Sequence, residues 1–247
     1  YCSNRDRPMP TQPSQFAMIL RKHLNNSRLV GVSQYGFDRV IRMDFEHGGG
    51  RLSLIIELFR DGNVLLLDQE GVIIRPLTHA KYASRSLKKG VEYAPPPEAI
   101  DPRNLSGESL NEILDSSDHA LIRTLASRVN LGRIYGSAVC SIAGIDEGLE
   151  SNSLTGEQRS SLVDALSGML YDLDKGQGGN IWLSDSESKD AWNAAENESA
   201  RDSAAAGIIE ISPIDLPSMD ENLRMSTTSL SEAYDFVFGS HDAAAFI

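Results

Sequence analysis

The apolar positions of this chain follow two different spacings. Between residues 14 and 24, Phe16, Leu20 and Leu24 recur at helical spacing, which predicts a helix that begins after Ser14. The next stretch has the period of strands, predicted at 29–34, 37–45, 52–59, 64–68 and 72–75. The breaks between these strands are short and contain glycine, Asn or Asp, so neighbouring strands should be antiparallel.

Helical spacing returns after three consecutive prolines at 95–97, which favour an extended connector over a central strand. Helices are predicted at 107–114, 119–129, 133–143 and 156–171, with Ser106 and Thr155 as N-caps. The predicted fold class is therefore α+β. An antiparallel β domain occupies 1–103, and a helical domain of the helix-hairpin-helix kind occupies 104–172. Residues 173–206 are polar and acidic and are expected to form an irregular insertion, followed by a last segment at 207–247.

The charge of the chain is unevenly distributed. The net charge is −12, yet residues 1–103 carry 15 Lys or Arg and 11 Asp or Glu. Residues 104–172 carry 4 and 10, and residues 173–247 carry 4 and 14. This uneven distribution of charge indicates that the first part of the chain binds an anionic partner and that the acidic remainder avoids it. Ordinary scatter in an acidic protein is the alternative.

No motif of a known catalytic or cofactor site occurs in the sequence. There is no GxGxxG, Walker or GxSxG motif, and the five histidines lack metal-ligand spacing. Cys2 and Cys140 are too isolated to suggest a disulfide framework or a zinc site, which is typical of a cytoplasmic protein. No apolar run reaches the ~20 residues of a membrane span. We therefore expect a binding protein that is not an enzyme and that uses no cofactor, membrane or small-molecule substrate.

One dipeptide, Asp38-Arg39, stands out at the start of the second predicted strand. Alternation would place Arg39 on the face of Ile41, Met43 and Phe45, which should be the core side. A charge on an apolar face is costly without a partner, so Arg39 is either part of a structural ion pair or held for recognition of phosphate, base or carboxylate.

The apolar residues around the next turn predict a strand register. If 47–50 form the hairpin loop, the pairs are Glu46–Arg51, Phe45–Leu52, Met43–Leu54, Ile41–Ile56 and Val40–Glu57. Arg42 would then lie diagonal to Glu57 and neutralise it. In this hairpin Asp38 and Arg39 have no obvious partner.

Further basic residues could contact phosphate groups, or they could form an ordinary solvated rim. They are Arg21, Lys22, Arg28, Arg85, Lys88 and Lys89.

Several motifs together resemble those of the NFACT family. The first is "P-x-x-F-x-M-x-L-R-K-x-L", which is matched by residues 13–24. Further matches, in the same order as in the family, lie at 34–39, 56–59, 62–63, 93–96, 131–145, 211–216 and 229–235. The chain is thus similar, over nearly its whole length, to the first domain and the helix-hairpin-helix-like region of the family's archaeal-type members, with 207–247 corresponding to the segment that leads to the base of a coiled coil.

The resemblance implies a role in ribosome-associated quality control. Family members of the NEMF and RqcH types bind large ribosomal subunits obstructed by peptidyl-tRNA, and several recruit alanyl-tRNA for tailing of the nascent chain. The family's Asp-Arg motif, matched here by Asp38 and Arg39, is implicated in handling aminoacyl-tRNA. The expected partners are therefore tRNA and the large ribosomal subunit.

Two other functions stay open from the sequence. The architecture also resembles the N-domain of formamidopyrimidine-type DNA glycosylases, although Tyr1 offers no N-terminal proline amine and zinc ligands are lacking. Some relatives are labelled fibronectin-binding proteins, which suggests an adhesin. The family's first strands and its coiled coil have no counterpart in these residues, and 172–206 matches no family motif.

Overall fold

The computed structural model describes residues 11–48, 50–59, 62–176, 178–196 and 198–244. Residues 1–10 of the expected first domain lie outside this range. The described chain forms two compact units, one of residues 11–101 and one that starts at Pro102. Each unit is described by itself.

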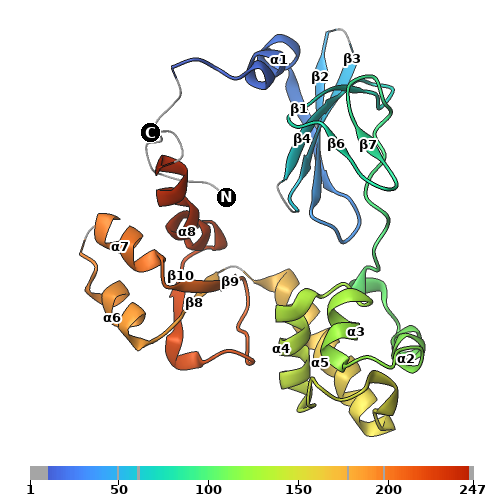
Figure 1. Ribbon diagram of the computed structural model, residues 1–247, viewed down its shortest axis with the longest axis vertical. Coiled ribbons are helices and arrows are strands. Elements are labelled where there is room, and N and C mark those ends of the chain that lie inside the picture. Colours follow the sequence, from blue (N-terminus) through green and yellow to red (C-terminus); the bar gives the residue numbers. More distant parts are fainter. Residues whose placement is uncertain (1–10, 49, 60–61, 177, 197, 245–247) are drawn as a thin grey trace. The chain divides into compact units, whose positions relative to one another are not determined.

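The first unit is built on a five-stranded antiparallel sheet in the simple order β1-β2-β3-β4-β5 (Figure 1). The strands are β1 (Arg28–Gln34), β2 (Val40–His47), β3 (Gly50–Glu57), β4 (Asn63–Leu67) and β5 (Ile73–Pro76). A small hairpin of β6 (Ala80–Lys81) and β7 (Ser86–Leu87) follows. Consecutive strands are neighbours because each connection is too short for a crossover.

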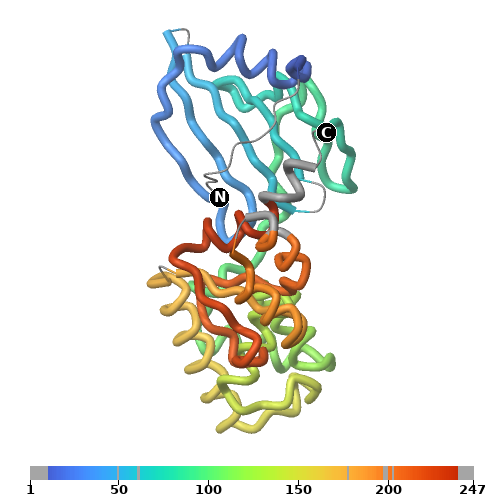
Figure 2. Tube along the Cα trace, turned by 90° about the vertical axis from the view of Figure 1, so that its left-hand side faces the viewer, coloured from blue at the N-terminus to red at the C-terminus, as the bar shows by residue number. Residues whose placement is uncertain are grey.

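Helix α1 (Gln15–Leu24) precedes the sheet. Its N-cap is Ser14, whose hydroxyl accepts a hydrogen bond from the Ala17 N–H at 3.2 Å, as the sequence predicted. The helix runs across the end of the sheet at which β2 turns into β3 (Figure 2). Its basic last turn therefore lies at that end.

The predicted register of β2 against β3 is confirmed at every pair. Phe45 faces Leu52, Met43 faces Leu54, and Ile41 faces Ile56. The register follows from the apolar pairs, because a slip by one residue would place each of them on the opposite face.

The predicted core side of β2 is confirmed only in part: Leu66, which pairs with Leu54 on that face, is fully buried, but the buried cluster lies on the other face. Ile41, Met43 and Phe45 are only half-buried, whereas Val40 on the opposite face is 1% exposed. The buried cluster on that face consists of Val40, Ile55, Leu65, Leu67, Ile73 and Leu87. Leu87 comes from the hairpin after β5, so a distant segment decides which face is buried, and the pattern of β2 and β3 alone does not contain that information.

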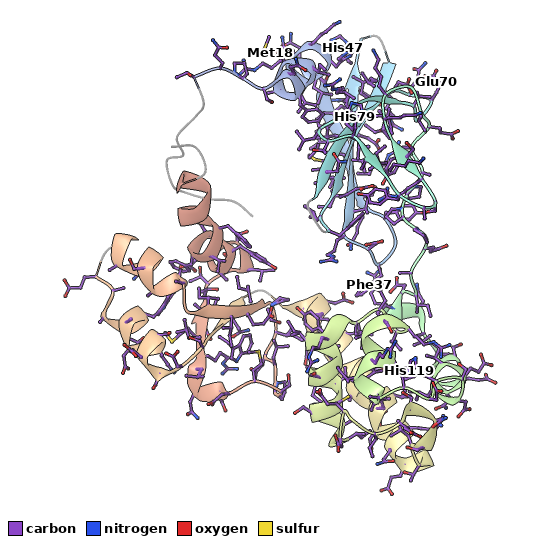
Figure 3. The ribbon with its side chains drawn as sticks, viewed as in Figure 1. Met18, Phe37, His47, Glu70, His79 and His119 are labelled. Carbon is purple, nitrogen blue, oxygen red and sulfur yellow. The ribbon has the colours of Figure 1, made fainter. Side chains whose placement is uncertain are left out.

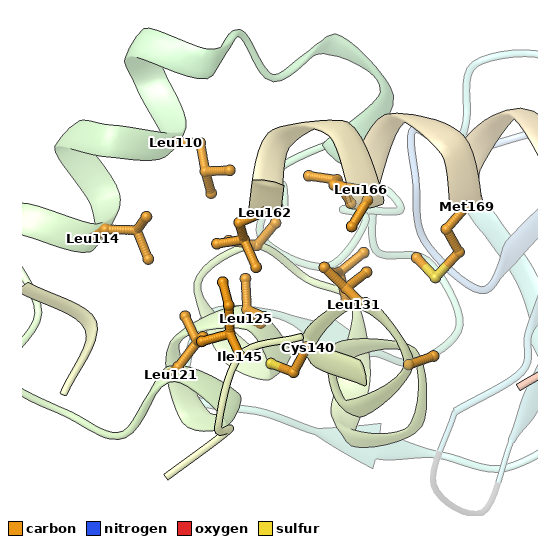
Figure 4. Packing of buried hydrophobic residues seen from close by; sticks show 14 of the residues in the cluster. Leu110, Leu114, Leu121, Leu125, Leu131, Cys140, Ile145, Leu162, Leu166 and Met169 are labelled. Atoms are coloured by element: carbon orange, nitrogen blue, oxygen red, sulfur yellow. The ribbon is translucent and has the colours of Figure 1, made fainter. Parts of the chain in front are cut away.

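The helical region contains α2 (Gly107–Asp115), α3 (Leu121–Ser127), α4 (Gly132–Ala143) and α5 (Gly156–Lys175), with 3-10 turns at Pro102–Asn104 and Ser151–Ser153. Thr155 and Gln158 form the predicted capping box at the start of α5. Leucines from α2, α3, α5 and the connections between the helices converge on one core, to which α4 adds Ala138, Val139 and Cys140 (Figure 4). The expected α+β class, with an antiparallel sheet followed by helices, is confirmed.

The segment 173–206 is not irregular, contrary to the sequence prediction. It contains β8 (Gly179–Leu183), α6 (Ser186–Ala194) and α7 (Glu198–Ala205). Strand β8 is the middle strand of a second sheet, flanked by β9 (Ile208–Ser212) and β10 (Arg224–Thr227). Ile181, Trp182 and Leu183 are at most 1% exposed. The strand is short and surrounded by polar residues, and partners farther along the chain stabilise it.

The chain continues through a 3-10 turn at Glu221–Leu223 and ends in α8 (Leu230–Ala244), which contacts β8, β9 and β10. None of the described helices combines the length and apolar composition needed to cross a membrane.

Candidate functional site

Asp38 and Arg39 lie in the turn between β1 and β2, not in a strand as predicted. The Tyr35 N–H donates to the Val40 carbonyl at 2.9 Å, and the Asp38 N–H donates back to the Tyr35 carbonyl at 3.2 Å. The Gln34 side chain also donates to the Asp38 carbonyl at 2.8 Å. Gly36 has a φ of 54°, which permits this tight reversal. The turn therefore removes Asp38 and Arg39 from the pleat of the sheet.

The two charged side chains of the turn differ in their surroundings. The Asp38 carboxylate is half-buried and accepts a hydrogen bond from the N–H of Arg39 at 2.6 Å. Arg39 is exposed, and its guanidinium forms no ion pair or side-chain hydrogen bond with the residues that the structure describes. The expected burial of Arg39 on an apolar face is thus wrong, and its charge carries no large desolvation cost. An exposed guanidinium held on an ordered turn is well suited to bind an anion.

A cavity of about 350 Å³ adjoins this turn within the first unit. Its lining combines charge, aromatic rings and proline: Asp38, Arg39, Phe59, Tyr82, Ser84, Arg85, Pro96 and Pro97. Phe37 in Figure 3 marks the end of the unit at which this turn lies, opposite to His47. A cavity with flat apolar walls and a free cation at its rim can accept a planar or anionic group.

Arg85, predicted as a phosphate contact, is held inside the unit by Glu57. The side chains of Arg85 and Glu57 are 4% and 1% exposed and form a two-pronged ion pair, with Arg85 Nη2 3.0 Å from Glu57 Oε2 and Arg85 Nη1 bonded to Oε1. The guanidinium also stacks on the Tyr82 ring, 4.8 Å from its centre. The charge of Arg85 is neutralised there, so its role is to shape the cavity wall.

The Tyr93 hydroxyl donates a third hydrogen bond to Glu57, at 3.0 Å. Burial, with the nearby carboxylate, raises the pKa of Tyr93 well above its ordinary value, so the hydroxyl stays a donor. The predicted neutralisation of Glu57 by Arg42 is wrong. Arg42 instead donates to Asp44 at 2.9 Å and to Ser53 at 2.9 Å.

The remaining predicted phosphate contacts do not lie at this cavity. Arg21 and Lys22 are exposed in the last turn of α1, and Lys88 and Lys89 are exposed after β7. Arg28 begins β1 and pairs with Glu46 at 3.1 Å. Since a seven-residue strand spans roughly 20 Å, Arg28 lies far from the turn that follows the end of β1.

Phe59, Tyr82 and Glu57 complete the site and were not among the residues singled out for it from the sequence. Their positions depend on contacts between β3 and the segment after β5, which no local pattern reports. Within the described ranges, no group of three or more His, Cys, Asp or Glu side chains is arranged to hold a metal ion.

The sequence of this chain is similar to those of known proteins of one family. Residues 1–210 match the family described as the NFACT N-terminal and middle domains. The chain is 30% identical over 191 residues to the archaeal Rqc2 homolog aRqcH of Methanocaldococcus jannaschii, covering 75% of this chain and 28% of that protein. It is 31% identical over 157 residues to the ribosome quality control complex subunit NEMF of Mus musculus, covering 62% of this chain and 14% of that protein.

Among solved structures, the chain is similar to the N-terminal part of the fibronectin/fibrinogen-binding protein from Streptococcus suis. The TM-score is 0.63 at 22% identity, covering 96% of this chain and 77% of that one. This likeness shows a shared fold.

These matches show that the chain is a homologue of ribosome quality-control factors. In particular, the chain belongs to the NFACT family, as the resemblance of its motifs predicted. It spans less than a third of the length of the archaeal relative.

Proposed function

We propose that this chain binds tRNA and the large ribosomal subunit in ribosome-associated quality control, and that it acts in the cytoplasm by binding and not by catalysis. The observation that carries the proposal is the exposed Asp38-Arg39 turn. It matches the family's Asp-Arg motif, and its guanidinium is unengaged among the described residues, beside a cavity lined by Phe59 and Tyr82. On this proposal the ligands are obstructed large subunits with peptidyl-tRNA, and alanyl-tRNA is recruited for tailing.

The distribution of charge supports the same assignment. Residues 1–103 have an excess of basic residues, whereas 104–247 are strongly acidic, so RNA contacts belong to the first unit. Arg21, Lys22, Arg28, Lys88 and Lys89 are exposed and offer further phosphate contacts away from the Asp38-Arg39 turn. Each contact of this kind adds to the salt dependence of binding, because it releases counterions from RNA.

The test measures tRNA affinity, co-sedimentation with large subunits and thermal unfolding for the same set of variants. Arg39→Ala should weaken tRNA binding by roughly tenfold or more, because an arginine that contacts nucleic acid contributes about 1–3 kcal/mol. Asp38→Ala should weaken it too, because the Asp38 carboxylate accepts the N–H of Arg39 and helps to fix the turn that presents the guanidinium. The unfolding temperature of Arg39→Ala should stay near that of the unmodified chain, since the Arg39 side chain is exposed. Asp38→Ala removes the acceptor of the Arg39 N–H, so its unfolding temperature should fall slightly.

Two control variants separate binding from folding. Arg133→Ala removes an exposed arginine of α4, in the acidic part of the chain, and should leave tRNA affinity nearly unchanged. Arg42→Ala disrupts the bonds to Asp44 and Ser53 and should chiefly lower stability. The proposal fails if Arg39→Ala unfolds the protein while tRNA affinity per folded molecule is unchanged. Preference for lesion-containing duplex DNA over tRNA would also contradict it.

A further inference from the structure

We propose that Glu57 is a positioning residue of the candidate RNA site: it holds Arg85 and Tyr82 in the cavity wall without contacting RNA itself. This inference rests on the function proposed above and adds a buried residue that the exposed charges would not assign to binding. Four observations lead to it.

The first observation is the burial of the carboxylate. Glu57 ends β3, faces Val40 of β2 and has a side chain that is 1% exposed. A buried carboxylate is costly unless hydrogen bonds surround it, and here both Nη atoms of Arg85 and the Tyr93 hydroxyl donate to it. The cavity wall thus contains a fully paired charge cluster.

The second observation is the origin of the partners. Arg85 and Tyr93 belong to the chain after β5, and Arg85 also donates to the carbonyl of Ala94 at 3.2 Å. The same guanidinium lies 4.8 Å from the centre of the Tyr82 ring and 5.7 Å from that of Phe59. One carboxylate therefore ties the segment from 82 to 94 to the end of β3.

The third observation is the continuity with the Asp38-Arg39 turn. The residue after Glu57 is Leu58, and its N–H donates to the carbonyl of Arg39 at 2.7 Å. The end of β3 therefore contacts the turn through its backbone and the opposite cavity wall through Glu57. Asp38 and Arg39 on one side and Tyr82 and Arg85 on the other line the same cavity.

The fourth observation is that the backbone hydrogen bonds of residues 90–93 anchor this segment near the start of β5. Gly90 and Val91 bond to Ile73, and the Tyr93 N–H bonds to the carbonyl of Gly71. These contacts fix the segment near the start of β5, and the β6–β7 pairs with buried Leu87 hold the hairpin backbone. Glu57 is left to orient the Arg85 guanidinium against the Tyr82 ring. A buried ion pair can be replaced by apolar residues with little loss of stability, so positioning and stability are separable.

The decisive experiment replaces the pair by apolar residues, Glu57→Leu with Arg85→Met, in the full chain. This double variant should unfold within a few degrees of the unmodified chain, yet bind tRNA roughly tenfold more weakly, the order of effect expected when the support of a binding group is lost. Hydrogen exchange of the Tyr82 amide, which donates to the carbonyl of Arg85, should accelerate about tenfold while the Ile55 and Leu66 amides stay protected.

The matched control replaces an exposed ion pair of the same sheet, Glu46→Gln with Arg51→Gln, and should change neither measurement. If the apolar double variant does not fold, Arg85→Lys takes its place. Lysine keeps the charge opposite Glu57 but cannot bond both carboxylate oxygens or stack as a plane on Tyr82. It should reproduce the weaker binding and the faster exchange.

Unchanged tRNA affinity in a folded variant would overturn the inference. If the unmodified chain does not bind tRNA, the proposed function fails, and exchange of the Tyr82 amide alone then decides the positioning role. Protection equal to that of the unmodified chain would show that Glu57 does not hold this wall.

Discussion

The two ends of the five-stranded sheet hold charged residues in opposite ways. At the end that carries the Asp38-Arg39 turn, Glu57 and Arg85 are 1% and 4% exposed and bond to one another at two points. At the end that carries the β2–β3 turn, the side chains of Arg28 and Glu46 are 79% and 48% exposed and share one contact of 3.1 Å. Figure 3 shows His47 and Phe37, which mark these ends, well apart in the unit.

The difference shows why a count of basic residues does not locate a site. Exposed ion pairs in water exchange partners easily and fix little geometry, whereas a buried, fully bonded pair can hold one arrangement. Among the described residues, the end that carries the Asp38-Arg39 turn exposes the guanidinium of Arg39 next to the rings of Phe59 and Tyr82. The end that carries the β2–β3 turn exposes more charged side chains, among them Arg28, Glu46 and Arg51, and their ion pairs fix less geometry.

The largest effect should come from Glu57→Ala. Removal of the carboxylate leaves Arg85 buried without its partner, which should cost about 3–5 kcal/mol of unfolding free energy. Urea unfolding measures this value directly. A loss below about 1 kcal/mol would mean that the two ends of the sheet do not differ as described.

A smaller effect is expected for Asp44, between the two ends. Burial acts to raise the pKa of Asp44, but hydrogen bonds from Ser53 and Arg42 outweigh it and lower the pKa below the ordinary 3.8. The ionised form therefore stabilises the fold above about pH 4, and this contribution is lost as the pH falls further. Relative to Asp44→Asn, the unmodified chain should be more stable by about 1 kcal/mol at pH 7.

Unfolding of both proteins between pH 7 and pH 3 tests this dependence. The advantage of the unmodified chain should shrink toward the acid limit. An advantage that is constant over the whole range would show that the charge of Asp44 contributes nothing.

The smallest effect is expected for Arg28→Ala at the exposed end. An ion pair with side chains this open to water contributes at most about 0.5 kcal/mol, so the unfolding free energy should hardly change. Added salt should reduce even that difference. A loss comparable to that of Glu57→Ala would remove the contrast between the two ends.

The parts of the fold that depend on neighbours in sequence could be predicted. The caps at Ser14 and Thr155 follow from local hydrogen bonding, and the β2–β3 register follows from apolar pairs across one short turn. The buried face of that hairpin could not be predicted, because Leu87 and the tyrosines after β5 cover it. Strand β8 was missed for the same reason, since its partners come later in the chain.

The candidate site was predictable only in part. Asp38 and Arg39 were identified, but as strand residues, because alternation says nothing about a turn stabilised by Tyr35 and Gln34. The partner of Glu57 was assigned to Arg42, the nearest cation in the hairpin, whereas the actual partner is Arg85. Such a pair depends on how separate segments pack, which sequence spacing does not encode.

The order of strands in the second sheet has a consequence for synthesis of the chain. Strand β8 is made first, β9 next and β10 last, yet β8 lies between the other two. A growing polypeptide that has emerged only as far as Ser212 therefore exposes one edge of β8, with Ile181 and Leu183 at a strand that can pair with foreign chains. Only the arrival of Arg224–Thr227 closes that edge, so a ribosome that stalls in between would leave the unfinished chain prone to aggregate.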